Sequence, residues 1–258
     1  MKIVMIGAGN VATHLASALQ NCGYNIVQVF SRTEASAKLL ANKLQCSFTN
    51  SEDCIQRNAD VYLYSVSDNA LESVVRAFHY PKGIHIHTAG SIHMDIFRNY
   101  TENYGVLYPM QTFSKQKAVD FNSVPIFTEA NNVDNLEIIN SIARKLSEKV
   151  YPISSEQRIK LHIAAVFACN FSNHCFRMAH EILEENQLPF YLMLPLIDET
   201  VEKLKHLTPE QAQTGPAVRN DQNVLEKHLK ALENHPEKQE LYRILSTSIS
   251  DKNKNIEE

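Results

Sequence analysis

The 258 residues suffice for one large domain or two modest ones, and 44% apolar with 21% charged residues is the composition of a folded globular protein. The net charge is −4, and the surplus of acidic residues lies after residue 152. Neither part carries the basic excess that is typical of nucleic-acid-binding proteins, so we expect no nucleic-acid partner.

The five cysteines are odd in number, and none forms a Cys-x-x-Cys pair. This pattern is typical of reduced thiols rather than of a disulfide framework. No leader segment and no run of 18 apolar residues is evident. The sequence therefore predicts a cytoplasmic protein without a membrane partner, and we assign no metal site.

The first 15 residues predict a strand, a tight turn and a helix in direct succession. An apolar, β-branched run ends in Gly7-x-Gly9-x-x-Ala12, and a helical pattern of apolar residues follows. In this context the motif is a dinucleotide fingerprint: Gly7 permits the turn, and Gly9 lets the backbone approach a pyrophosphate at the helix N-terminus. The cofactor-binding residues predicted here are Gly7, Ala8, Gly9, Asn10 and Val11. The alternative is a generic strand-to-helix turn.

A second strand is predicted over residues 25–30, and it ends in Ser31-Arg32-Thr33. An NAD site would place Asp or Glu there to hold the ribose 2′-hydroxyl, but the first carboxylate is Glu34. An arginine between two hydroxyls suits a 2′-phosphate, so we favour NADP. The alternative is that Arg32 is a solvated loop residue and that Glu34 caps the next helix.

The remaining elements up to residue 152 alternate between strands and helices. The pattern predicts strands at 61–66, 84–87, near 106, 124–127 and 149–151, with helices at 35–44, 69–78, 94–99 and 133–147. This order predicts a Rossmann-type parallel sheet covered on both faces, in a domain of residues 1–152. Ligands bind at the carboxyl edge of such a sheet, which loops 65–68, 87–90 and 108–112 would line. From these loops we assign Ser65, Val66, Ser67, Ala89 and Gly90 to the cofactor site.

After Pro152 only helices are predicted, at 155–186, 189–207, 216–234 and 236–248. They form a smaller all-α domain of residues 153–258, in which residues 251–258 are expected to fray. Four helices in so short a segment cannot cover a helix that is apolar all round. We therefore predict a homodimer formed through the helical domain.

The first of these helices is almost wholly apolar over residues 161–169, which predicts a buried central helix, apart from His162. Polar residues form one stripe along it at helical spacing. The members expected to face water are Arg158, His180 and Glu184. His162 and Asn170 lie in the apolar stretch and are expected to face a polar cleft. The alternative for His162 is a core histidine with satisfied hydrogen bonds.

Five motifs spread along nearly the whole chain follow patterns of known proteins. They are residues 6–11 (IGAGNV), 87–91 (HTAGS), 108–113 (YPMQTF), 162–170 (HIAAVFACN) and 214–219 (TGPAVR). The layout resembles the 6-phosphogluconate-dehydrogenase-like group. It most resembles a Rossmann-like NADP oxidoreductase family whose members add a helical domain of unknown function. The first domain is also similar to pyrroline-5-carboxylate reductases and to deazaflavin-dependent NADP reductases.

The resemblance implies an NADP(H)-dependent oxidoreductase. It would transfer hydride to or from a small carbonyl, imine or deazaflavin-type substrate bound between the two domains. A non-catalytic NADP(H)-binding sensor or scaffold is the alternative, and methyl transfer on the same fold is a third hypothesis.

The resemblance also raises the question of the proton donor. Hydroxyacid dehydrogenases of this group carry Lys-x-x-x-Asn on the first interdomain helix. If Asn170 is that asparagine, Val166 stands at the lysine position, so we do not expect lysine-based chemistry. His162 lies one turn away on the same face, and we assign it as the proton donor with Asn170 as an orienting partner.

Overall fold

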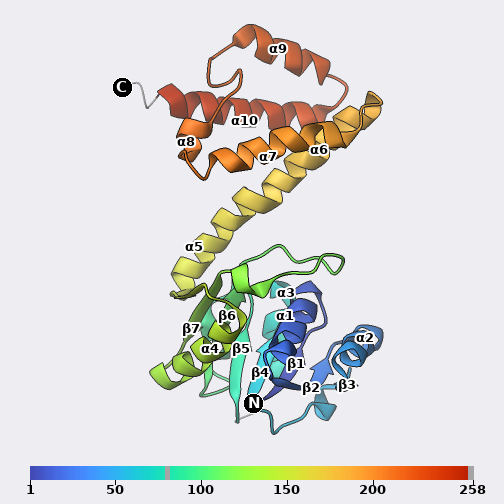
Figure 1. The fold of residues 1–258 in the computed structure, drawn as a ribbon, viewed down its shortest axis with the longest axis vertical. Coiled ribbons are helices and arrows are strands. Elements are labelled where there is room, and N and C mark those ends of the chain that lie inside the picture. The colour runs from blue at the N-terminus through green and yellow to red at the C-terminus, as the bar shows by residue number, and fades with distance from the viewer. Residues whose placement is uncertain (79–81, 255–258) are drawn as a thin grey trace. The chain divides into compact units, whose positions relative to one another are not determined.

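The computed structural model describes residues 1–78 and 82–254. The chain divides into two compact units, Met1–Asn170 and Phe171–Glu258. The predicted fold class is confirmed: a mostly parallel, eight-stranded Rossmann-type sheet with covering helices is followed by a helical region (Figure 1). The first unit extends beyond residue 152, where strands give way to helices, because the next helix begins on the sheet.

The sheet has the strand order β3-β2-β1-β4-β5-β6-β7-β8. Its strands are β1 (Lys2–Ile6), β2 (Asn25–Phe30), β3 (Ser47–Thr49), β4 (Val61–Tyr64), β5 (Ile84–His87), β6 (Tyr104–Pro109), β7 (Ile126–Ala130) and β8 (Val150–Pro152). All neighbours pair in parallel except β6 and β7. These two strands are antiparallel because a loop with one short turn joins them, whereas a parallel pair needs a long crossover.

Helices cover both faces of the sheet (Figure 1). Apolar side chains of α1 (Asn10–Asn21), α2 (Glu34–Leu44) and α4 (Val133–Leu146) share one core with one face. Those of α3 (Asp68–Ala77) and the 3₁₀ turn Met94–Phe97 pack on the other. The strands are buried on both faces, as expected for a covered parallel sheet. The ends of β1, β4 and β5 therefore meet at one edge, where ligands bind in such folds.

Helix α5 (Ser155–Ala165) begins against the sheet. Arg158, which we expected to face water, is 1% exposed. Its guanidinium pairs with the carboxylate of Glu129 on β7 and donates to the carbonyl of Ile92. The Ser155 hydroxyl donates to the same carboxylate at 2.7 Å. The expectation was wrong because a polar stripe on a helix does not reveal whether water or a buried carboxylate lies opposite it.

The apolar stretch that follows is not buried in this chain, contrary to the sequence-based expectation. Ile163 and Phe167 are 53% and 66% exposed, while His180 and Glu184 are exposed as expected. Residues Val166–Phe171 form a π-helical segment, in which hydrogen bonds run i→i+5. The α-helical wheel used for the prediction therefore does not carry through this segment to Asn170.

The helical unit contains few buried apolar residues. Its helices are α6 (Ser172–Glu185), α7 (Leu194–Lys203), α8 (Pro209–Ala212), α9 (Gln222–Ala231) and α10 (Pro236–Lys254). The start predicted at residue 216 was wrong, because Asp221 caps α9 by accepting from the Val224 N–H. Helix α10 begins at Pro236 as predicted and runs to Lys254. The fraying expected from residue 251 is thus not seen there, and 255–258 lie outside the described residues.

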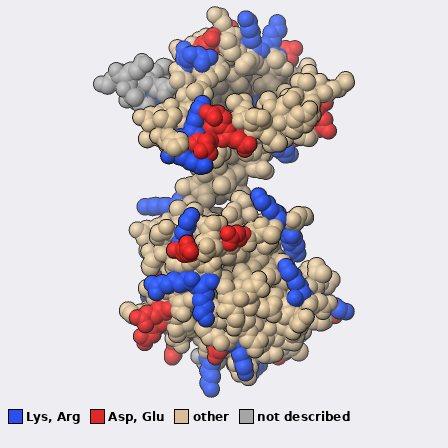
Figure 2. Space-filling view, viewed as in Figure 1, with Lys and Arg blue, Asp and Glu red and all other residues tan. Residues whose placement is uncertain are grey.

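The surface carries both signs of charge. On the face shown in Figure 2, acidic and basic side chains are interspersed over both units. None of the helices within 1–78 and 82–254 combines the length and the apolar character that a bilayer crossing needs.

Candidate functional site

The turn after β1 admits only glycine at its first position. Gly7 has a φ of 118°, and a Cβ there would lie 2.1 Å from the carbonyl oxygen of Ser65. Its N–H donates to the Phe30 carbonyl at 2.8 Å. Gly7 therefore lets β1 end in close contact with the strands on both sides of it.

Gly9 serves a different purpose in the same turn. It is the N-cap of α1 and supplies no side-chain acceptor to the first helical turn. A Cβ at Gly9 would meet no atom within 4 Å, so the space over the helix N-terminus is open. This is the space that a pyrophosphate occupies in dinucleotide-binding folds, facing free N–H groups and the positive end of the helix dipole. The residues present therefore fit such a group.

A hollow of about 150 Å³ joins this turn to the ends of β2 and β4. The predicted cofactor residues that line it are Gly7, Ala8, Gly9, Ser31, Arg32, Ser65, Val66 and Ser67. Arg32 is exposed and forms no ion pair or hydrogen bond within the part of the chain that the structure describes. A guanidinium with neither an ion pair nor a hydrogen bond among the described residues thus borders the hollow.

The other predicted cofactor residues are not part of the lining of this hollow. They are Asn10, Val11, Thr33, Ala89 and Gly90. Asn10 donates to the Phe113 carbonyl at 2.9 Å, and His14 bonds the Ser114 carbonyl at 2.8 Å. The loop after β6 is thereby tied to the first turn of α1.

The structure brings His162 to the carboxyl edge of the sheet. Its Nδ1 lies 3.1 Å from the Tyr108 hydroxyl at the end of β6. A Cβ on Gly90 would lie 2.6 Å from the same nitrogen and 3.0 Å from the Tyr108 ring. Gly90, which we assigned to the cofactor, thus gives the imidazole room to pack beside the tyrosine. Asn170 is exposed in the π-helical segment and has no hydrogen bond to this pair.

Tyr108 was not among the predicted site residues, although loop 108–112 was predicted to line this edge. Burial raises the pKa of its phenol; Arg158 opposes this shift, and Asp68 adds to it. The phenol therefore stays protonated and serves as a hydrogen-bond partner of the imidazole. The sequence signal was present in residues 108–113, but the contact spans 54 positions of the chain.

His87 lies on the neighbouring strand and is fully buried. Burial, with smaller contributions from Arg158 and His93, lowers its pKa from 6.5 to about 3. Its Nδ1 accepts from the Ala89 N–H at 3.2 Å. His87 is thus a neutral structural group at physiological pH.

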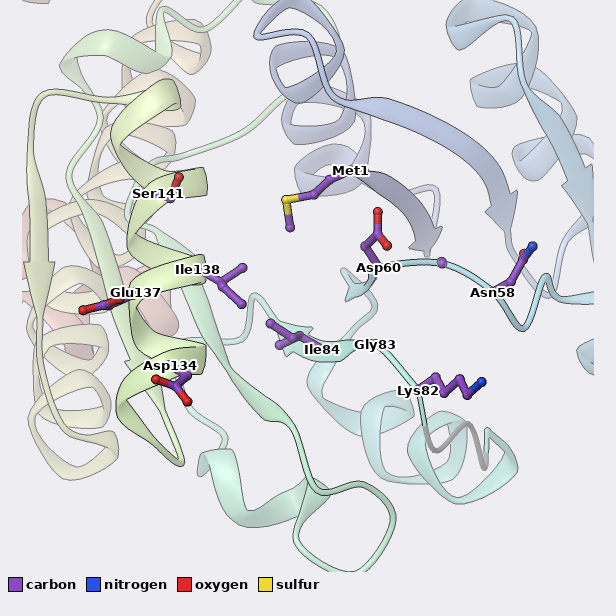
Figure 3. Close-up of a pocket in the computed structure, with 11 residues that line it drawn as sticks. Met1, Asn58, Asp60, Lys82, Gly83, Ile84, Asp134, Glu137, Ile138 and Ser141 are labelled. Atoms are coloured by element: carbon purple, nitrogen blue, oxygen red, sulfur yellow. The ribbon is translucent and has the colours of Figure 1, made fainter.

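A larger hollow, of about 910 Å³, lies at the opposite edge of the sheet. Figure 3 shows its lining from the starts of β1, β4 and β5, with Asp60, Ile84 and Met1, and from α4, with Glu137 and Ile138. Parallel sheets bind ligands at the carboxyl ends of their strands. Size alone therefore does not identify the functional site in this fold.

Comparisons with known proteins agree with this geometry. Residues 2–89 match the family model "NADP oxidoreductase coenzyme F420-dependent", and residues 124–249 match "Domain of unknown function (DUF2520)". A Bacteroides fragilis protein, provisionally named an NADP oxidoreductase, is 47% identical over 97% of this chain and 98% of its own, with a TM-score of 0.93. No curated protein matches the sequence.

Two more distant structures share the fold. An imine reductase from Myxococcus stipitatus, in complex with NADP⁺, has a TM-score of 0.69 at 15% identity, covering 97% of this chain and 92% of its own. A 1-pyrroline-5-carboxylate reductase from Streptococcus pyogenes has a TM-score of 0.63 at 14% identity, covering 97% and 98%. The site belongs to a Rossmann-fold oxidoreductase. The chain is a member of the NADP oxidoreductase family that carries this helical domain of unknown function.

The two glycines of the turn give a matched pair of variants. Gly7→Ala should lower the free energy of unfolding by at least about 2 kcal/mol, because the methyl group meets the Ser65 carbonyl at a positive φ. Gly9→Ala should change it by less than about 0.5 kcal/mol yet weaken NADPH binding at least tenfold, since the methyl group enters the open space. Urea unfolding and fluorescence titration measure both effects. Unchanged NADPH affinity in Gly9→Ala would show that the pyrophosphate does not bind at this turn.

Proposed function

We propose that the protein is an NADP(H)-dependent oxidoreductase that reduces, or forms by oxidation, a C=O or C=N bond of a small molecule. One observation supports the choice of NADP. Arg32, which forms no ion pair or hydrogen bond among the described residues, borders the same hollow as the Gly7–Gly9 turn, where the space for a pyrophosphate is open. Guanidinium binds phosphate oxygens in a bidentate fork, and Ser31 and Thr33 offer hydroxyls beside it. The NADP⁺ complex of the imine reductase with this fold adds support.

The bound nicotinamide would supply or accept the hydride, and the chain's own residues would handle the proton. His162 is the proton donor in this proposal. The Tyr108 hydroxyl is hydrogen-bonded to Nδ1 of His162, so Nε2 is the nitrogen that can face a substrate. Asn170 remains the proposed orienting partner, to be tested by substitution. The alternative of a sensor or scaffold predicts NADPH binding without turnover of any carbonyl or imine compound.

The cofactor preference tests the first part of the proposal. Wild-type protein should bind NADPH several-fold more tightly than NADH, and Arg32→Ala should remove about 1.5–3 kcal/mol of NADPH binding while leaving NADH unchanged. Calorimetry with both cofactors measures the ratio. Lys38→Ala, which removes an exposed charge from α2, is the control and should not alter the ratio. Preference for NADH in the wild type contradicts the assignment.

The proton donor is tested by kinetics. With any carbonyl or imine compound that turns over, His162→Ala should lower kcat by about 10²–10⁴ while NADPH affinity stays the same. Tyr108→Phe loses the hydrogen bond to Nδ1 and should lower kcat by roughly tenfold. His206→Ala, an exposed histidine of the helical unit, should be neutral. Full activity in His162→Ala would make this residue a structural histidine.

We also propose that the helical unit forms a homodimer. Ala217 and Leu225 are the buried hydrophobic residues among its described positions, whereas thirteen large apolar side chains from Phe171 onward are more than one-third exposed. Tyr191 and Leu196, for example, are 66% and 62% exposed. So much apolar surface in one small unit needs a partner, and a second copy supplies a matching surface.

Light scattering at micromolar concentration should therefore give a mass near twice 29.3 kDa. The double change Leu196→Glu and Val201→Glu on α7 should shift the protein toward the monomer, since both side chains are exposed. Leu39→Glu is the matched control, because Leu39 is equally exposed on α2 of the first unit. A single 29.3 kDa species in the wild type excludes the dimer under these conditions.

A further inference from the structure

Four polar side chains from separate segments lie together where the substrate of the proposed reaction would bind. The first pair is His162 and Tyr108, joined at 3.1 Å. Ser91 follows Gly90, against which both of their rings pack. The Ser91 hydroxyl donates to the carboxylate of Asp68, the first residue of α3. A carboxylate is thereby fixed close to the imidazole and the phenol.

This carboxylate is exposed in the first turn of α3, and no cation among the described residues pairs with it. Asp68 forms no ion pair with any Lys, Arg or His in residues 1–78 and 82–254. Its neighbour Ser91 is neutral, so the hydrogen bond orients the carboxylate without cancelling its charge. The buried Arg158 nearby is already paired with Glu129. One negative charge therefore remains at this end of the site.

Asp68 also lines a hollow between α3 and residues 92–96, whose lining does not include His162 or Tyr108. It measures about 680 Å³ and is lined by Asp68, Asn69, Glu72, Ile92, His93 and Ile96, with no lysine or arginine in that set. Glu72 is paired with Arg76 one turn along α3, at 2.5 Å. Asp68 is thus the unpaired acid that a ligand entering this hollow would meet.

We propose that the substrate is an imine, reduced in its protonated iminium form to an amine, and that Asp68 recognises the positive charge of the nitrogen. This inference rests on the proposed function and narrows it. A carboxylate stabilises a cation and destabilises the anion that develops on oxygen when a carbonyl is reduced. The site therefore discriminates between the two substrate classes by charge.

The reaction balances with the groups named. His162, in its imidazolium form, would give the proton on Nε2 to the imine nitrogen, which becomes iminium, and would be left as neutral imidazole. When bound, the reduced nicotinamide would supply the hydride that forms the new C–H bond, while the C=N π pair would move to nitrogen as a lone pair. The products are the amine and the oxidised nicotinamide, and His162 regains its proton from water. Asp68 would lie beside the nitrogen that gains and then loses the positive charge.

Binding of matched probes tests the proposal without relying on turnover. The full-length protein, saturated with NADP⁺, is titrated in a calorimeter with 2-methylpyrrolidine, a cation at neutral pH, and with 2-methyltetrahydrofuran, its neutral analogue. The amine should bind at least about tenfold more tightly, and Asp68→Asn should remove that difference. Glu72→Gln is the control, because Glu72 lines the same hollow but is paired, and should leave the difference intact.

Activity supplies the second arm. With NADPH, 2-methyl-1-pyrroline should be reduced with a kcat/KM at least about tenfold above that for 2-methylcyclopentanone, and Asp68→Asn should lower the imine value alone. Faster reduction of the ketone overturns the proposal. So does equal binding of the two probes to the wild type. Weaker NADP⁺ binding in Asp68→Asn with unchanged amine preference likewise overturns it, by assigning the carboxylate to the cofactor.

Separate titration with NADPH distinguishes a failure of the imine assignment from a failure of the proposed function. If NADPH binds and the probes are not distinguished, the proposed function stands and the imine assignment fails. If NADPH does not bind, the proposed function fails and the imine assignment fails with it. An unfolding temperature equal to that of the wild type would establish that Asp68→Asn is folded. We expect this result because Asn retains an oxygen that can accept from Ser91.

Discussion

The buried ion pair between Arg158 and Glu129 fixes the start of α5 on the sheet. It joins the first turn of α5 to β7, while the same guanidinium holds the Ile92 carbonyl in the loop after β5. Removing one member of such a pair typically costs about 3–5 kcal/mol, because the other charge stays buried. Arg158 is four residues before His162. The ion pair therefore sets the helix turn that places the imidazole beside Gly90 and Tyr108.

Local signals explain why the cofactor half of the molecule was predictable from sequence. The strand, turn and helix of residues 2–21 are specified by neighbours in the chain, and Gly7 lies where only glycine fits. The three-residue strand β3 was missed because its hydrogen bonds are made with β2 and it is too short for an alternating pattern to show. The antiparallel pairing of β7 was missed for a related reason: it depends on the connection rather than on the strand.

Helical periodicity predicted less about the part of the chain after residue 152. It identified a polar stripe on the helix but could not tell water from the buried carboxylate of Glu129, 29 residues earlier. It also predicted burial for residues 161–169, which a single chain leaves largely exposed. An apolar helix face in the sequence predicts that the face is covered, but it does not show whether the same chain or another molecule covers it. The π-helical segment then shifts every residue after Val166 relative to an ideal wheel.

The substrate end of the site depends on contacts that no local pattern encodes. The three loops were predicted to share one edge, yet the meeting of Tyr108 with His162 requires a glycine at position 90, since a side chain there would occupy the place of the imidazole. The same loop carries Ser91, which orients Asp68. A single glycine thus makes room for the imidazole in the same loop that holds the Asp68 carboxylate. Because Arg158 is paired with Glu129, the charge that the proposed substrate would meet beside His162 is that of Asp68. In the proposed reaction, this charge would favour a reacting group that passes through a cation over one that passes through an anion.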